Sequence, residues 1–146
     1  MKIIARSFPL ALALICFDLL PKLQALTSAP DRGYPGGNTA EGQNALLSLS
    51  SGTYNTAVGL LALTNNAVGT FNTAVGAGTL LVNSSSENTA SGAGALLNNA
   101  TGSANTVNGV FALFGNTTGS GNIALGAAAG VNLTTGNNNI EIEMLV

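Results

Sequence analysis

Few side chains in this sequence could carry chemistry. Beyond residue 40 the acidic residues are Glu41, Glu87, Glu141 and Glu143; the chain has a single cysteine, Cys16, and no histidine. Without histidine or a second cysteine there can be no Ser-His-Asp triad, no Cys-His pair and no transition-metal cluster. A glycosidase pair would need glutamates that lie far apart or alternate along one segment. We therefore expect no catalytic residue, no metal site, no cofactor and no enzyme activity.

The charge distribution excludes a large class of partner. From residue 26 onward there is one basic residue, Arg32, against five acidic residues, so that the net charge is −4. Nucleic-acid binding needs lysine and arginine to neutralise phosphates. We expect no nucleic-acid partner. Calcium-binding β-rolls need an aspartate in every repeat, and none follows Asp31.

Four segments match the N-glycosylation pattern N-x-S/T. They begin at Asn83, Asn99, Asn116 and Asn132. The simpler interpretation is that asparagine and threonine are the residues that a recurring turn uses.

A repeat must position all of these residues. Blocks beginning with asparagine start at residues 38, 55, 72, 88, 105, 122 and 139, and read N-T-A-V-G-x-x-A-L-x-x-N-x-T-G-x-x. We call each block a rung, and we number its columns from the asparagine. Seventeen residues cannot enclose a core, so each rung must stack on the next. The sequence predicts an all-β fold, a parallel β-solenoid of about six and a half rungs.

Three columns define the rung: asparagine in column one, glycine in column five and leucine in column nine. The clearest copies are Asn55, Gly59 and Leu63; Asn72, Gly76 and Leu80; Asn88, Gly92 and Leu96; and Asn105, Gly109 and Leu113. Two glycines in most rungs would weaken a helix, whereas short apolar segments bounded by glycine and asparagine are typical of strands. We expect two short strands and two corners per rung. The third rung is one residue shorter within 83–87, which predicts a surface loop there, with Ser84 and Ser85 exposed and replaceable by alanine.

The sequence leaves open which side of the first strand faces inward. Column four holds Glu41, Ser91 and Asn108 as well as valine, and such residues are costly to bury. We therefore expect the alanine of column three to face inward against the leucine of column nine, with stacked asparagines bonded from rung to rung. The threonines of column two would then form an outward row. They are Thr39, Thr56, Thr73, Thr89 and Thr106.

The first 25 residues resemble an export signal. Lys2 and Arg6 precede the apolar run 8–17, and Ala25 offers a small residue for cleavage. The run is too short to span a bilayer. We expect a signal peptide at 1–25, a linker at 26–37 that is rich in proline and glycine, a repeat domain at 38–146, and a secreted or cell-surface location.

The phrase N-T-A-V-G followed by A-L, clearest at residues 55–59 and 72–76, resembles the head repeats of trimeric autotransporter adhesins (YadA-like), and related repeats of bacterial surface proteins and phage tail fibres. The resemblance covers residues 38–142. It implies a left-handed parallel β-roll that trimerises and binds host or matrix surfaces. The family's rung is nearer 14 residues, and its inward positions correspond to Thr56 and Val58, opposite to the orientation expected from the columns. Unlike in that family, we expect no coiled-coil stalk or membrane anchor after the repeats.

Two functions fit these observations. The first is a structural or adhesive module that attaches to a host surface, a matrix or a carbohydrate and self-associates, either as a trimer or end to end. The second is a solenoid that binds ice or carbohydrate through its threonine and asparagine rows. The last strand carries Glu141 and Glu143 on the side of the alanine column, and we expect these charges to discourage a further rung from stacking.

Overall fold

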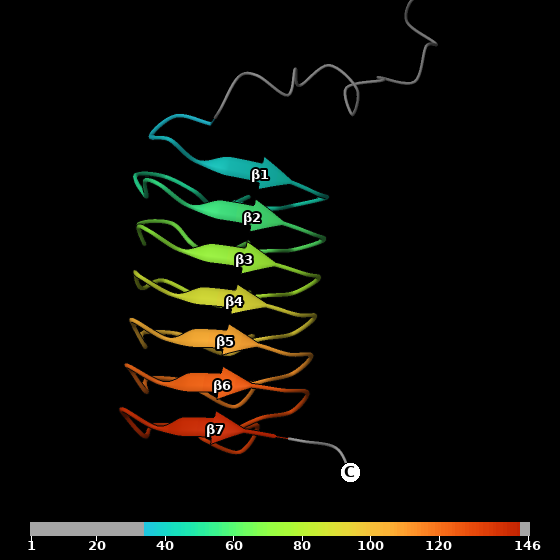
Figure 1. Cartoon of the computed structure of the whole chain (residues 1–146). Helices are drawn as coiled ribbons and strands as arrows, with labels where there is room; N and C mark the ends of the chain where they lie inside the picture. The colour runs from blue at the N-terminus through green and yellow to red at the C-terminus, as the bar shows by residue number, and fades with distance from the viewer. Residues whose placement is uncertain (1–33, 144–146) are drawn as a thin grey trace, which may run out of the picture. The chain divides into compact units, whose positions relative to one another are not determined.

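The computed structural model of this chain describes residues 34–143. The predicted signal peptide and most of the predicted linker lie outside the described residues. The strands are β1 (Thr39–Glu41), β2 (Thr56–Val58), β3 (Thr73–Val75), β4 (Thr89–Ser91), β5 (Thr106–Asn108), β6 (Ile123–Leu125) and β7 (Ile140–Ile142). They form one parallel sheet in chain order (Figure 1). The predicted all-β solenoid with a 17-residue repeat is confirmed.

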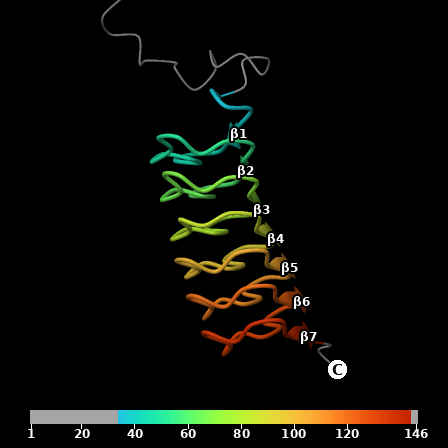
Figure 2. The same cartoon turned by 90° about the vertical axis from the view of Figure 1, so that its left-hand side faces the viewer.

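The coil is left-handed. In Figure 1 the chain runs to the right along β1–β7 at the front, returns behind the sheet and descends by one rung. Figure 2 places the strands along one side of the coil and the returning turns on the other. Each strand pairs with the next in strict register, so that Thr56 lies beside Thr73 and Ala57 beside Ala74. Equivalent side chains therefore recur at the inter-strand spacing of about 4.8 Å.

The expectation of two strands per rung is wrong, because each rung has only one strand of three residues. The apolar segment Ala62–Leu63 of the second rung lies in a turn. The cause is the backbone of column nine. The φ angles of Leu46, Leu63, Leu80, Leu96 and Leu113 lie between 47° and 52°. A left-handed residue bends the chain, so that an extended strand cannot pass through it.

The core lies between the alanine and leucine columns. Ala57, Ala74, Leu63 and Leu80 are fully buried. Columns two and four point outward, and their side chains are exposed or half-buried. The inward orientation of alanine is therefore confirmed, and the orientation that the resemblance implied for Thr56 and Val58 is wrong for this chain. A small residue on the strand leaves room for a large residue from the opposite turn.

We expect Leu80→Ala to lower the free energy of unfolding by about 2–4 kcal/mol, because it leaves a cavity in a core that cannot collapse around it. The matched control is Leu47→Ala, since Leu47 is 64% exposed. It should cost less than about 0.5 kcal/mol. Chemical denaturation followed by circular dichroism measures both. Equal effects for the two variants would contradict the assignment of the core.

Two ladders of buried asparagines hold the rungs together. In column one, Asn38 Oδ1 accepts hydrogen bonds from the backbone N–H of Asn55 at 2.8 Å and from its side-chain amide at 3.0 Å. Asn72 bonds to Asn55 in the same way, at 2.9 and 3.1 Å. The amide of Asn55 also donates to Gly69 O at 2.8 Å. The predicted stacking of asparagines is therefore confirmed.

The second ladder, in column twelve, was not expected. It consists of Asn66, Asn83, Asn99 and Asn116, each fully buried. The amide of Asn116 donates to Asn99 Oδ1 at 2.8 Å. The rungs at its two ends carry Leu49 and Leu133 in this column. The ladder therefore ends at Asn66, whose amide nitrogen donates to Gly69 O at 3.0 Å, and at Asn116, whose oxygen accepts from the backbone N–H of Gly119 at 3.1 Å. Within residues 34–143, every buried side-chain nitrogen and oxygen has a hydrogen-bond partner.

Residues 34–37 belong to the bonded solenoid, although the sequence placed them in the linker. Tyr34 exchanges two backbone hydrogen bonds with Asn38, at 3.0 and 3.3 Å. The side-chain amide of Asn38 donates to Pro35 O at 2.6 Å. This turn supplies the partners that a preceding rung would supply, and it therefore terminates the first asparagine ladder.

Glu141 interrupts the alanine column at the other end, as expected. Its rung stacks below a rung that has Gly130 instead of leucine in column nine. A Cβ on Gly130 would lie 3.0 Å from Glu141 Cγ and 2.9 Å from a methyl group of Leu113. The missing leucine side chain thus makes room for the glutamate, which is only partly buried.

The shortened third rung is completed by Ser85, whose side chain is half-buried and hydrogen-bonded, so the expectation that it is exposed is wrong. Its Oγ lies 2.9 Å from Asn83 Oδ1, accepts from the amide of Asn88 at 3.1 Å and also contacts Gly102 O. Its carbonyl accepts from Asn72 at 2.8 Å, in the place that Gly69 takes for Asn55. Ser85 therefore joins both ladders where one residue is missing.

We expect Ser85→Ala to destabilise the fold by about 1–3 kcal/mol, because partly buried amides lose their partner. Ser84 is exposed, and Ser84→Ala should cost less than about 0.5 kcal/mol. The midpoint of urea unfolding distinguishes the two variants. Equal midpoints would mean that water replaces the serine hydroxyl at residue 85.

Candidate interaction surface

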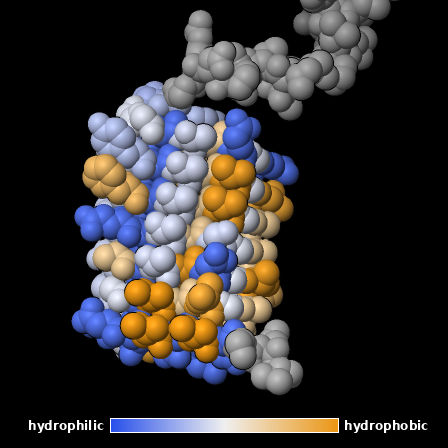
Figure 3. Space-filling view, viewed as in Figure 1, coloured by the Kyte–Doolittle hydropathy of each residue, from blue (hydrophilic) through white to orange (hydrophobic). Residues whose placement is uncertain are grey.

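The outer face of β1–β7 is the most regular surface of the described chain, and we call it the strand face. Columns two and four supply its side chains. Column two consists of Thr39, Thr56, Thr73, Thr89, Thr106, Ile123 and Ile140, and column four of Glu41, Val58, Val75, Ser91, Asn108, Leu125 and Ile142. All of them are exposed or half-buried. Figure 3 shows the two columns running side by side along the coil, with hydrophobic residues gathered near β6 and β7.

The predicted threonine row lies on this face, in register from β1 to β5. Among the described residues, none of its five hydroxyl groups makes a hydrogen bond, unlike Thr64, Thr79 and Thr117, whose hydroxyls bond to carbonyls. The row is thus a line of free donors and acceptors, repeated at about 4.8 Å. β6 and β7 continue it with Ile123 and Ile140, which have methyl groups but no hydroxyl.

Two aromatic rings lie beside the row. Tyr54 and Phe71 stack with a centroid distance of 5.2 Å and an interplanar angle of 10°. A Cβ on Gly37 would lie 3.0 Å from the Tyr54 ring. Phe71 therefore covers one face of the Tyr54 ring and the Gly37 backbone lies near the ring, although Tyr54 remains 61% exposed.

The asparagine rows cannot form part of a binding surface, and this corrects the expectation that they contribute to one. The asparagines of columns one and twelve in the second to fifth rungs are fully buried, and their amides bond to one another and to backbone carbonyls. Burial also excludes Asn83, Asn99 and Asn116 as glycosylation acceptors. Only the fourth matching asparagine, Asn132, is exposed.

The glutamates do not converge on a site. Glu41 lies in β1, Glu87 in the turn before β4, and Glu141 and Glu143 in or next to β7. Among the described residues there is no group of three or more histidine, cysteine, aspartate or glutamate residues that could hold a metal ion. Residues 34–143 also contain no helix long and apolar enough to cross a membrane.

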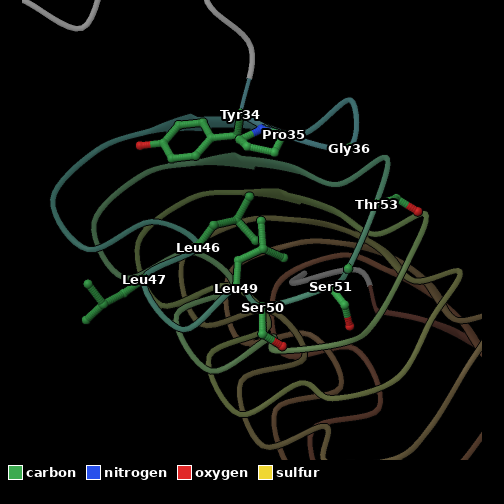
Figure 4. A pocket seen from close by; sticks show the side chains of 10 residues that line it. Tyr34, Pro35, Gly36, Leu46, Leu47, Leu49, Ser50, Ser51 and Thr53 are labelled. Atoms are coloured by element: carbon green, nitrogen blue, oxygen red, sulfur yellow. The ribbon is translucent and has the colours of Figure 1, made fainter.

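A hollow of about 420 Å³ lies where the described coil begins (Figure 4). Leu46 and Leu49 line it together with Tyr34, and the hydroxyls of Ser50 and Ser51 lie near its rim. Leu49 occupies column twelve, so the hollow is the open end of the core rather than a cleft in its side. Its polar side chains are the hydroxyl groups of Tyr34, Ser50, Ser51 and Thr53, and no histidine, cysteine, aspartate or glutamate lines it.

The fold and the surface define a parallel β-solenoid with one flat, nearly uncharged sheet face. The chain matches no protein-family model, no curated protein and no solved structure. Its likeness to adhesin head repeats therefore rests on the repeat phrase and on the left-handed parallel coil.

Proposed function

We propose that this chain is a non-enzymatic structural and adhesive repeat module that attaches to an extended surface through its strand face. The observation that carries the proposal is the row of free threonine hydroxyls, held in register on a rigid stack. Multivalent contact suits such a face, because identical groups recur along the coil and each adds a small free energy. The adhesive head repeats that the sequence resembles support the same role.

The proposed setting is outside the cell. The basic and apolar start of the chain supports export. The fold owes nothing to disulfide bonds, since no cysteine lies within residues 34–143. Its stability comes from the asparagine ladders and the apolar core, so the fold would persist in an oxidising as well as in a reducing environment.

Adhesion of beads coated with the full chain to a matrix-coated surface under flow tests the proposal. We expect Thr56→Lys combined with Thr73→Lys to reduce the number of bound beads roughly tenfold, because two charges interrupt a neutral face. The control pair, Thr101→Lys with Thr118→Lys, introduces the same charges at exposed threonines outside the strand face. Raising the salt from about 0.05 to 0.5 M should have little effect, since the face has no basic residue. Equal loss in both pairs, or no adhesion of the unmodified chain, would contradict the proposal.

Binding to ice is a second candidate, favoured by the same hydroxyl row because an ordered lattice can match an ordered array. Thermal hysteresis measured on the full chain and on Thr73→Lys decides it. Thermal hysteresis that disappears in the Thr73→Lys variant would support ice binding in place of matrix adhesion. Its absence in the unmodified chain would leave adhesion alone.

A further inference from the structure

A second exposed surface shares column four with the strand face and continues around the turn that follows each strand. We call it the corner surface and define it by columns four and six of the second to sixth rungs. Its members are Val58, Val75, Ser91, Asn108 and Leu125 in column four, and Leu60, Ala77, Ala93, Val110 and Ala127 in column six. None of them is charged. Figure 3 shows hydrophobic side chains along this side of the strand face.

Column six has a distinct profile of side-chain size. Leu60 in the second rung is 48% exposed and Val110 in the fifth is 47% exposed. The third, fourth and sixth rungs have only Ala77, Ala93 and Ala127 at this position, and all three are exposed. The surface therefore has two ridges, at Leu60 and Val110. Two shallow rungs separate the ridges, and one further shallow rung follows the second.

This profile complements itself when a second copy is turned end for end. If a two-fold axis passes through the fourth rung, perpendicular to the coil, the second rung faces the partner's sixth rung and the third faces its fifth. Leu60 then meets Ala127, and Val110 meets Ala77. Ala93 meets its own copy at the axis. Each large side chain thus meets a small one.

We propose that two copies of this chain form an antiparallel two-fold dimer through their corner surfaces, with Ala93 at the axis. A parallel arrangement, including a parallel trimer, would place Leu60 against Leu60 and Val110 against Val110, and would leave the third and fourth rungs apart. Close packing favours the antiparallel copy, because gaps in an interface lose contacts as they do in a core. Column four then pairs Val58 with Leu125, Val75 with Asn108 and Ser91 with its own copy, so it adds one apolar pair and no charge.

The charges also favour a second copy as the occupant. Within residues 34–143 the four charged side chains are all glutamates, and none lies in the corner surface. The glutamates of the chain would repel an acidic partner, and a basic partner would find no acidic side chain in the corner surface to pair with. An uncharged surface that packs against its own copy removes no ionic group from water. In the antiparallel dimer Glu41 lies at the rim, near the partner's last strand. Salt should therefore strengthen the dimer slightly by screening like charges.

The interface is small. Five rungs at about 4.8 Å each give a strip on the order of 20 Å long. Columns four to six span two residues at roughly 3.3 Å each, so the strip covers on the order of 150 Å², well below the standard interface of about 800 Å² per partner. We expect a dissociation constant on the order of 0.1 mM. Column four belongs to both surfaces, so the dimer would cover one edge of the strand face. Thr56→Lys with Thr73→Lys tests attachment through column two, whereas Ala93→Glu tests dimerisation through column six.

Sedimentation equilibrium of the full chain up to about 0.5 mM tests the dimer. We expect a monomer–dimer equilibrium that Ala93→Glu abolishes, because the axis would bring two buried carboxylates together. The control, Ala104→Glu, adds the same charge to an exposed alanine in column seventeen, where the preceding rung already has Glu87. Unchanged thermal unfolding of both variants shows that the fold is intact. A monomer at every concentration, a trimer, or dimerisation that survives Ala93→Glu would each overturn the proposal.

Cysteine pairing tests the register in a Cys16→Ser background. Under mild oxidation we expect Ala93→Cys to form a disulfide-linked dimer by itself. Leu60→Cys and Ala127→Cys should each remain largely unlinked, but should link to each other when the two proteins are mixed. Linking of Leu60→Cys to itself in preference to Ala127→Cys would show a parallel arrangement and overturn the two-fold axis proposed here.

Discussion

Gly76→Val is expected to prevent the stack from forming at the third rung. Gly76 has a φ of 130°, and a Cβ built on it would lie 2.8 Å from the carbonyl carbon and oxygen of Gly92 in the next rung. That neighbour is backbone and is held by the rung-to-rung hydrogen bond from Gly92 N to Val75 O. The side chain can therefore be accommodated only by separating two rungs. We expect a loss of at least about 4 kcal/mol, which is enough to unfold a marginal domain.

The control for this variant is Gly78→Asn, two residues further along the chain. Gly78 also has a positive φ, of 66°, but a Cβ there would meet only a methyl group of Leu97, at 3.6 Å. The first rung already has Asn44 in this column, with a φ of 60°. Gly78→Asn should therefore cost less than about 1 kcal/mol. Circular dichroism and thermal unfolding measure both variants, and a folded Gly76→Val protein would show that the rungs can separate locally.

Asn72→Ala is expected to be the most damaging removal of a polar side chain. Asn72 Oδ1 accepts from the backbone N–H of Asn88 at 3.1 Å, and its amide donates to Asn55 Oδ1 at 3.1 Å and to Ser85 O at 2.8 Å. Alanine would leave these groups with fewer partners or none, in a site closed to water. Since each buried unpaired group costs about 1–3 kcal/mol, we expect a loss of about 3–5 kcal/mol.

Asn65→Ala is the matched control, because Asn65 is exposed and its side chain makes no hydrogen bond to the described residues. It should change the free energy of unfolding by less than about 0.5 kcal/mol. Denaturant unfolding distinguishes the two variants. Similar midpoints would mean that water enters the ladder, and that the asparagine columns set the register of the rungs without stabilising them.

The repeat itself could be predicted because a 17-residue period leaves only one physical solution. Such a block has no core of its own, so equivalent residues must stack. The inward position of Ala57 and Ala74 followed from the polar residues of column four, which are costly to bury. The threonine row then had to face outward, because neighbouring residues of a strand point to opposite faces.

The second asparagine ladder was missed because its pattern has two interpretations. Asn83, Asn99 and Asn116 each begin a segment that matches a glycosylation site, and a turn rich in asparagine looks exposed. One signal was present in the sequence: column twelve has Leu49 and Leu133 at the two ends of the repeat. A column that holds both leucine and asparagine indicates a buried position. An asparagine is retained there only if neighbouring rungs can form hydrogen bonds to its amide.

The sequence by itself determined the stack, its period and the direction of its alanine and threonine columns, since these depend only on which residues recur and on whether they can be buried. The tertiary structure decided the single strand per rung, the left-handed coil and the role of Ser85. Leucine has no preference for a positive φ, so nothing in the sequence distinguishes the bend at Leu63 from a second strand. Ser85 matters only because the fold brings Asn83, Asn88 and Gly102 around its hydroxyl. Contacts of that kind arise between rungs, and a pattern read along one chain does not contain them.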